Sequence, residues 1–196
     1  VIKSNKGTAK FLDEDGKQNR MQENTSGKTG GAVWASGSLA LENYLFEENK
    51  AGMETASNGG AIYVEGGTTI ATVTKAVLKN NESVKNCGGA ISNQGAVLTI
   101  SDSEFEGNKT IASNLNGGAI YSNNNTSDTT ITNSKFVNNE AKDGGAIRLT
   151  AGILTVEDCI FESNKATQNG GAICTTPANE QSVVEVHVKG GSFKAN

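Results

Sequence analysis

The residues with the clearest potential to bind a metal ion lie near the N-terminus, in the segment DEDGKQN at positions 13–19. Asp13 and Asp15 supply carboxylates at alternating positions before a glycine, and Asn19 adds an amide oxygen, as at the start of a calcium-binding loop. The full loop needs a glutamate at its twelfth position, where this chain has Asn24. An exposed turn is therefore the simpler interpretation. If the chain takes a structural calcium ion, we expect Asp13, Asp15 and Asn19 to bind it, and we expect no other cofactor.

Side chains that could act in acid–base catalysis are few. The chain has a single histidine, His187, which lies on the outward side of a predicted strand, with Lys189 two residues later. Adjacent acids such as Glu157 and Asp158 would point to opposite sides of a strand, so they cannot flank one scissile bond. We therefore expect no enzymatic activity.

Five Asn-x-Ser/Thr sequons offer possible sites of glycosylation. A chain this rich in Asn, Ser and Thr produces such tripeptides by chance, so the motif alone carries little weight. Asn81 and Asn108 also fall on an inward-facing row of the repeat described below, where a glycan would not fit. If the protein is glycosylated, we expect the sugar on Asn124 or Asn125, in a polar loop.

A repeat of 26–29 residues organises the chain and must position all of these side chains. Gly-Gly-Ala followed by Ile or Val occurs six times, beginning at Gly30, Gly59, Gly88, Gly117, Gly144 and Gly170. Each copy continues to Phe-x-x-Asn, with leucine for phenylalanine in the second copy; the pairs are Phe46/Asn49, Leu78/Asn81, Phe105/Asn108, Phe136/Asn139, Phe161/Asn164 and Phe193/Asn196. Six matched pairs in register indicate a solenoid of stacked units.

The segment between the two motifs alternates apolar and polar residues, as in Leu98-x-Ile100 and Leu154-x-Val156, which predicts a strand with one buried face. Three short strands per repeat, with Gly and Asn at the corners, would form one coil of a parallel β-helix. The expected fold is all-β, a right-handed parallel β-helix of about six to seven coils, because crossovers between parallel strands are almost always right-handed. We expect one domain over 1–196, with a divergent coil at 1–29 and the six repeats at 30–196.

Stacked coils place equivalent residues in rows about 4.8 Å apart. The phenylalanine row, Phe46, Phe105, Phe136, Phe161 and Phe193, should form an aromatic core, and the asparagine row, Asn49, Asn81, Asn108, Asn139 and Asn164, should form a hydrogen-bonded ladder. In the divergent segment, residues 1–3 resemble a middle strand, and Ala9 and Phe11 match the steps that lead to the phenylalanine row. On that alignment Glu14 replaces the ladder asparagine.

The residue after Ala-Ile or Ala-Val forms another row, which carries the large side chains Trp34, Tyr63, Tyr121 and Arg148. By strand alternation it shares a face with the alanines of the motif. An alanine floor flanked by aromatic rings could bind sugar rings or a partner surface. Alternatively, this face is the crowded inner side of the coil and the isoleucines point elsewhere. The sequence favours neither interpretation.

The pairing of GGA[ILV] with FxxN over residues 30–196 resembles the repeats of chlamydial-type polymorphic membrane proteins and, more broadly, right-handed parallel β-helix repeat proteins. The resemblance implies an autotransporter passenger that is exported to the cell surface and used in adhesion. It therefore implies an extracellular or cell-surface location, with a host-cell or matrix protein or glycan as partner. Right-handed β-helix carbohydrate lyases and hydrolases are a second similar group, but the clustered catalytic side chains of that group have no counterpart here.

The composition of the chain argues against two classes of partner, nucleic acid and the membrane interior. The net charge is −4 without long charged runs, so no basic face for nucleic acid is expected. No apolar stretch approaches the ~18 residues of a membrane span, so direct membrane insertion is not expected. The most favoured function is a surface adhesin or displayed binding module. The alternative is the subunit of an extracellular filament in which the chain stacks end to end on itself, because the repeat continues to Asn196.

Overall fold

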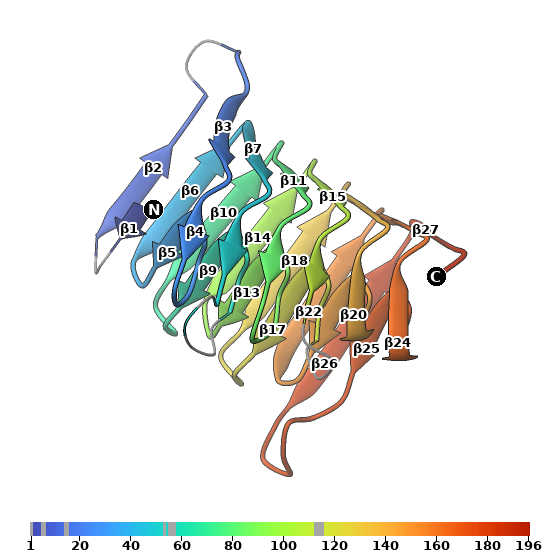
Figure 1. Ribbon diagram of the computed structural model, residues 1–196. Helices are drawn as coiled ribbons and strands as arrows, with labels where there is room; N and C mark the ends of the chain where they lie inside the picture. The colour runs from blue at the N-terminus through green and yellow to red at the C-terminus, as the bar shows by residue number, and fades with distance from the viewer. Residues whose placement is uncertain (1, 5–6, 14–15, 53, 55–57, 112–115) are drawn as a thin grey trace.

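The computed structural model describes residues 2–4, 7–13, 16–52, 54, 58–111 and 116–196. These residues form a solenoid of parallel strands and contain no helix (Figure 1). Six successive coils contribute a strand to each of four sheets, and a seventh coil contributes to three of them. The expected all-β parallel solenoid is confirmed, and its right-handed direction stays a prediction of the crossover rule.

The four sheets are named A to D in the order in which the chain meets them. Sheet A holds β1 (Ile2–Ser4), β5 (Val33–Ala35), β9 (Ile62–Glu65), β13 (Ile91–Gln94), β17 (Ile120–Asn123), β21 (Ile147–Leu149) and β25 (Ile173–Thr175). Sheet B holds β2 (Thr8–Phe11), β6 (Ser38–Glu42), β10 (Ile70–Thr74), β14 (Val97–Ser101), β18 (Asp128–Thr132), β22 (Gly152–Glu157) and β26 (Val184–Lys189).

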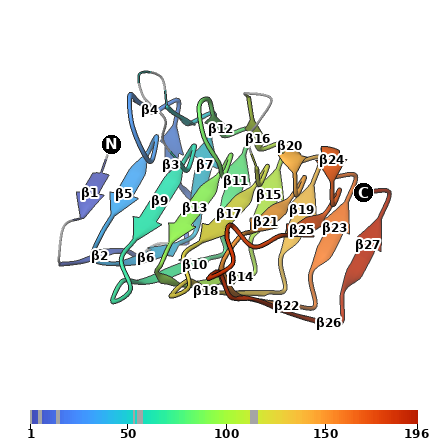
Figure 2. The same ribbon diagram turned by 90° about the horizontal axis from the view of Figure 1, so that it is seen from below.

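Sheet C holds β3 (Asn19–Gln22), β7 (Tyr44–Glu47), β11 (Val77–Lys79), β15 (Glu104–Glu106), β19 (Lys135–Val137), β23 (Ile160–Glu162) and β27 (Ser192–Lys194). Sheet D holds β4 (Thr25–Ser26), β8 (Lys50–Ala51), β12 (Glu82–Ser83), β16 (Lys109–Thr110), β20 (Glu140–Asp143) and β24 (Lys165–Asn169). Sheets B and D lie on opposite sides of the coil (Figure 2). The prediction of three strands per coil is wrong, because the first four strands of sheet D have only two residues each and show no periodicity.

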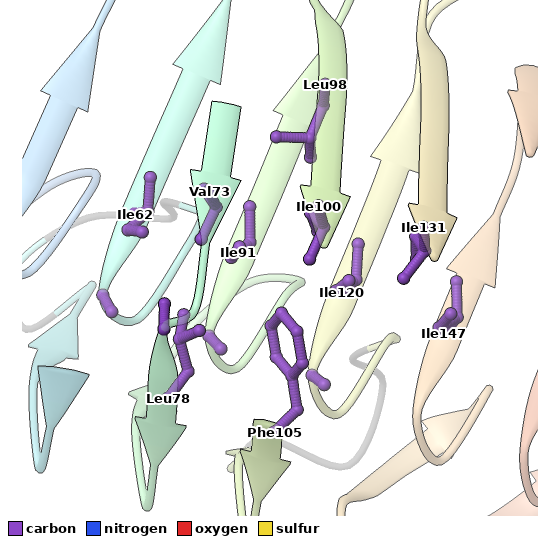
Figure 3. Packing of buried hydrophobic residues seen from close by; sticks show 14 of the residues in the cluster. Ile62, Val73, Leu78, Ile91, Leu98, Ile100, Phe105, Ile120, Ile131 and Ile147 are labelled. Atoms are coloured by element: carbon purple, nitrogen blue, oxygen red, sulfur yellow. The ribbon is translucent and has the colours of Figure 1, made fainter. Parts of the chain in front are cut away.

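The core lies between the sheets and is built from rows of equivalent side chains. Isoleucines of sheet A point toward Val73, Ile100 and Ile131 of sheet B, and Leu78 and Phe105 of sheet C close the third side (Figure 3). The rings of Phe105, Phe136, Phe161 and Phe193 stack with centroids 4.6, 4.8 and 4.7 Å apart and interplanar angles of 7° or less. These separations match the spacing of neighbouring strands, so ring stacking follows directly from the register of sheet C.

A ladder of asparagines runs along the corner between sheets C and D. Asn139 Oδ1 accepts hydrogen bonds from the backbone N–H and from Nδ2 of Asn108, each 3.0 Å long. Asn139 Nδ2 in turn donates to the carbonyl oxygen of Phe105 at 3.0 Å and to Oδ1 of Asn164 at 2.9 Å. The same bonds join each successive pair in the row Asn24, Asn49, Asn81, Asn108, Asn139, Asn164 and Asn196.

Both glycines of the repeated pair are required by the corner before sheet A. Gly117 has φ +70°, and a Cβ there would lie 2.2 Å from the carbonyl oxygen of Ile120. A Cβ on Gly118 would lie 2.1 Å from the carbonyl oxygen of Gly145 on the next coil. Two further corners use non-glycine residues with positive φ, such as Asp102 before sheet C and Asn138 before the ladder.

The N-terminal segment forms a coil through all four sheets, but in a different register from the one expected. β1 pairs with β5, so residues 2–4 belong to sheet A rather than to the middle strand. Phe11 pairs with Leu41 in sheet B, whereas Met21 takes the place of the phenylalanine beside Phe46. The predicted alignment of Phe11 with the phenylalanine row is therefore wrong, because an unbranched methionine fills that position.

The stacked rings predict a large loss of stability on truncation. Phe136 is fully buried between two other rings, so Phe136→Ala should lower the free energy of unfolding by about 3–5 kcal/mol, measured by urea denaturation. Val137→Ala, on the outward side of the same strand, is the matched control and should cost less than about 1 kcal/mol. Equal losses in the two variants would contradict this account of the core.

Two substitutions at Asn139 test the asparagine ladder. Both should lower the free energy of unfolding, and for Asn139→Asp the loss should depend on pH. Asn139→Ala should cost about 1–3 kcal/mol, because buried partners on both sides lose a hydrogen bond. Asn139→Asp places a carboxylate against the acceptor oxygens of Phe105 and Asn164, so its pKa in the folded chain should rise. A raised pKa gives stability that is lost as pH rises, so this variant should be closer to the parent chain at pH 4 than at pH 7 in urea titrations. A loss that does not change with pH would show that water replaces the ladder contacts.

Candidate binding surfaces

The row of large side chains on sheet A faces away from the core and is largely covered. The isoleucines of the repeat point into the core, so the interpretation that this row is the inner side of the coil is wrong. Tyr63 is 9% and Arg148 is 8% exposed, and Trp34 and Tyr121 are half-buried. The row therefore does not form an open platform.

Arg148 is a buried charged residue of this row and lies on β21, the sixth of the seven strands of sheet A. Its Nη1 donates to Cys174 Sγ at 2.7 Å, and its Nε is buried with no partner among the described residues. Cys87, at the end of the connection from sheet D to sheet A, lies near Tyr121 and Arg148. Burial raises the pKa of the Cys87 thiol and of the Tyr121 hydroxyl, which keeps both groups neutral. Sequence reasoning did not anticipate the Arg148–Cys174 contact, although the residues occupy the same place in successive repeats.

Tyr63 is held by a neighbour on its own strand. Its hydroxyl donates to Glu65 Oε2 at 2.9 Å. Burial, the hydrogen bond to Glu65 and the charge of Glu65 all raise the pKa of Tyr63 well above its ordinary value. The phenol therefore stays protonated and acts as a structural hydrogen-bond donor.

The residues proposed for calcium lie on the excursion between β2 and β3. Both carboxylate oxygens of Asp13 accept hydrogen bonds, Oδ1 from the backbone N–H of Gly16 at 2.7 Å and Oδ2 from Asn43 Nδ2 at 3.0 Å. Asn19 is exposed at the start of β3, and Asp15 lies outside the described residues. Across the described residues, no three His, Cys, Asp or Glu side chains come together as a metal site.

The single histidine is exposed on β26. His187 Nε2 lies 2.8 Å from Glu185 Oε1, and the two side chains are 57% and 53% exposed. His187 pairs with Thr155 on the neighbouring strand, yet no hydrogen bond joins their side chains within the described structure. The imidazole lies beside a carboxylate, but among the described residues no nucleophile is hydrogen-bonded to it, and the hollow that it lines with Thr155 and Lys189 is open to solvent.

The two candidate glycosylation sites lie at the exposed corner between sheets A and B. Asn124 has φ +94°, and its Oδ1 accepts from the N–H of Thr126 at 3.1 Å. Asn125 bridges to a later loop, donating to the carbonyl of Gln181 and accepting from the N–H of Val183, both at 3.0 Å. Asn124 is therefore the less constrained of the two amides.

Alternating charges line the outer side of sheet D. The row reads Lys50, Glu82, Lys109, Glu140 and Lys165 from coil to coil. Glu82 forms ion pairs of 2.9 Å with both Lys50 and Lys109. Burial alone would raise the pKa of Glu82, but the hydrogen bonds and charges of the two lysines outweigh it and lower the pKa. This arrangement is an ion network in which the carboxyl group of Glu82 stays ionised at neutral pH.

The outer side of sheet B is different, because its middle strands carry hydroxyl side chains. One row consists of Thr72, Thr99, Thr130 and Thr155, which pair directly with one another on β10, β14, β18 and β22. A second row consists of Thr74, Ser101 and Thr132. Ile70 and Val97 lie at the start of two of these strands and are 57% and 39% exposed. We call the outward side chains of β10, β14, β18 and β22 the threonine face.

Sequence reasoning did not single out the threonine face, because these residues count there only as the polar positions of alternating strands. The available signal was the recurring Thr-Val-Thr, Thr-Ile-Ser and Thr-Ile-Thr at the same step of three successive repeats. Threonine is common on strands for packing reasons alone, so the triplets become informative only once the strands are known to be neighbours.

The ion network on sheet D predicts how stability responds to acid. Because the pKa of Glu82 is lowered in the folded chain, its contribution is present above its ordinary value of 4.5 and is lost as pH falls below it. Glu82→Gln should therefore make the urea midpoint less sensitive to pH between about 5 and 3. Glu140→Gln is the control, since Glu140 lies in the same row but forms no ion pair in the described structure. Identical acid profiles for the parent chain and Glu82→Gln would refute the proposed network.

Comparison with known proteins identifies the repeat itself. Three segments, 43–65, 102–123 and 158–176, match the Chlamydia polymorphic membrane protein repeat. Together they cover about a third of the chain, and each runs from the corner before sheet C to the end of a sheet A strand or just past it. Searches of the curated proteins and of the solved structures return no significant match. Within the described part of the chain, no helix has the length and apolar character needed to cross a bilayer. The protein is thus a parallel β-solenoid that carries repeats of the Chlamydia polymorphic membrane protein type.

Proposed function

We propose that the chain is a non-enzymatic, surface-displayed binding segment of the adhesin type. The proposal rests on a difference between the inward and corner positions of each coil, which recur, and the outward positions. The residues that recur in every repeat, such as the glycine pair, the isoleucine and the ladder asparagine, face the core or the corners. Most outward positions, such as the sheet A row with Trp34, Tyr63 and Arg148, vary from coil to coil, whereas the threonine row of sheet B recurs. The repeat therefore maintains a scaffold whose surface differs from one sheet to the next.

The outward side chains support binding better than catalysis. Lys50, Glu82 and Lys109 of sheet D form ion pairs with one another, and the His187–Glu185 pair is exposed on an open strand surface. An acyl- or glycosyl-transfer site needs a nucleophile or a second carboxylate at a fixed distance and exclusion of water. The described outer surface brings together no such set, which favours the non-enzymatic interpretation.

A cell-surface location is proposed from the repeat type. The matched repeat is that of a family of polymorphic membrane proteins, which favours display at a bacterial surface. A parallel solenoid suits display at a cell surface, because its long outer faces are exposed along the whole stack of coils. A host-cell or matrix protein or glycan is the proposed class of partner.

The test is binding of the purified, fluorescently labelled chain to cultured epithelial cells and to deposited extracellular matrix. We expect saturable binding, measured by flow cytometry and plate fluorescence and competed by an excess of the unlabelled chain. The His187→Ala variant should bind within about twofold of the parent chain, because an exposed histidine outside a buried site contributes little.

Two outcomes would contradict the proposal. Spontaneous fibres in negative-stain images, without cell binding, would favour the filament subunit. Release of sugars from a polysaccharide by the parent chain but not by His187→Ala would show that the protein is an enzyme.

A further inference from the structure

The threonine face differs from the other outer surfaces in having a continuous row of hydroxyls that lack partners among the described residues. The side chains of Thr72, Thr99, Thr130 and Thr155 form no hydrogen bond to any described residue, and only Ser101 and Thr74 bond to each other, at 3.3 Å. Some hydroxyls elsewhere are bonded internally, as Ser134 Oγ is to the carbonyl of Thr132, and others that form no bond within the described structure, such as Thr167 and Thr175, do not belong to a row of hydroxyls across successive coils. A row of unused donors and acceptors at about 4.8 Å intervals is therefore available to a ligand.

The charge of the face restricts the ligand. Among the outward side chains of β10, β14, β18 and β22, only Asp128 and Glu157 are charged, and both are acidic. Sheets C and D instead carry Lys–Glu pairs, such as Lys79–Glu106 and Lys109–Glu82. A polyanion such as nucleic acid or a sulfated glycan would meet no cation on the threonine face, so the surface fits an uncharged partner.

The size of the face points to an extended polymer rather than a folded protein. Four strands about 4.8 Å apart and five residues long, at about 3.3 Å per residue, give a patch of roughly 300 Å². A stable protein interface buries about 800 Å² on each partner, well over twice that area. A chain lying along the solenoid axis, by contrast, would meet a new threonine hydroxyl at every coil from β10 to β22.

Neutral sugars have the matching chemistry. A hexose ring presents C–H groups on its faces and hydroxyls at its edges, and the threonine face presents exposed Ile70 and Val97 beside rows of threonine hydroxyls. A hexose in an extended glycan spans about the distance between neighbouring coils, so successive sugars can repeat the same contacts. We propose that the threonine face binds a neutral polysaccharide running along the solenoid axis, which rests on the proposed function by naming its surface and its class of partner.

The test is affinity electrophoresis of the full chain in native gels that contain hydroxyethylcellulose, galactomannan, dextran or heparin. We expect at least one of the three neutral polymers to retard the chain and heparin to leave it unchanged. Thr99→Lys with Thr130→Lys places two hydrated cations in the central row, and the dissociation constant measured from the gels should rise about tenfold or more.

Two variants make the comparison specific. Val137→Lys with Ile160→Lys adds the same charge on the outward side of sheet C and should bind like the parent chain. Thr99→Val with Thr130→Val keeps the shape and strand preference of the side chains, so it tests the hydroxyls even if the lysine variant fails to fold. It should also weaken binding about tenfold, with circular dichroism confirming that the variant is folded.

The outcomes separate this inference from the proposed function. Unchanged retardation of the folded valine variant, or retardation by heparin alone, would overturn the inference. Cell binding without retardation by any neutral polymer would leave the display function standing and also overturn the inference. Retardation that both threonine variants lose, in a chain that binds no cells, would support the inference and overturn the adhesin proposal.

Discussion

Parallel stacking in exact register is the constraint on which the rest of this protein depends. Each coil lies about 4.8 Å from the next, so every side chain contacts its own equivalents above and below. A residue type can recur at one position only if it packs well against itself. Phenylalanine meets this condition by stacking, with centroids 4.6–4.8 Å apart, and asparagine meets it because its amide carries both donors and an acceptor.

The same constraint limits the outer surface, where like charges cannot be stacked without repulsion. Sheet D solves this by alternating lysine and glutamate, as in Lys50, Glu82 and Lys109. Sheet B solves it in its middle strands with neutral hydroxyl side chains. The first solution uses the charged groups internally, whereas the second leaves the hydroxyls of Thr72, Thr99, Thr130 and Thr155 without a partner among the described residues and therefore available to bind another molecule.

Sequence reasoning predicted the rows of equivalent residues, but it misaligned the first coil and missed the strands of sheet D. The register of the six repeats follows from the Gly-Gly-Ala-Ile and Phe-x-x-Asn motifs, and the strands lie where those motifs predict. The first coil was misaligned because Ala9 and Phe11 imitate the motif, whereas Met21 and Asn24 occupy it. The fourth strand was missed because two residues carry no period, and its partners are fixed by the coils above and below.

The sequence by itself determined the architecture: a parallel all-β solenoid, its inward rows and its glycine corners. These features can be predicted because each follows from residue types that recur from repeat to repeat: the apolar face of a strand, the ring in the stack and the glycine at a corner that has no room for a Cβ. Only the tertiary structure decided which outer row is open. The aromatic row with Tyr63 and Arg148 is covered, whereas the row of Thr72, Thr99, Thr130 and Thr155 on sheet B is available. Within this row Arg148 contacts Cys174 on the next coil, and Cys87, at the end of the connection from sheet D to sheet A, lies nearby. The accessibility of a surface therefore depends on contacts between segments that the repeat does not encode.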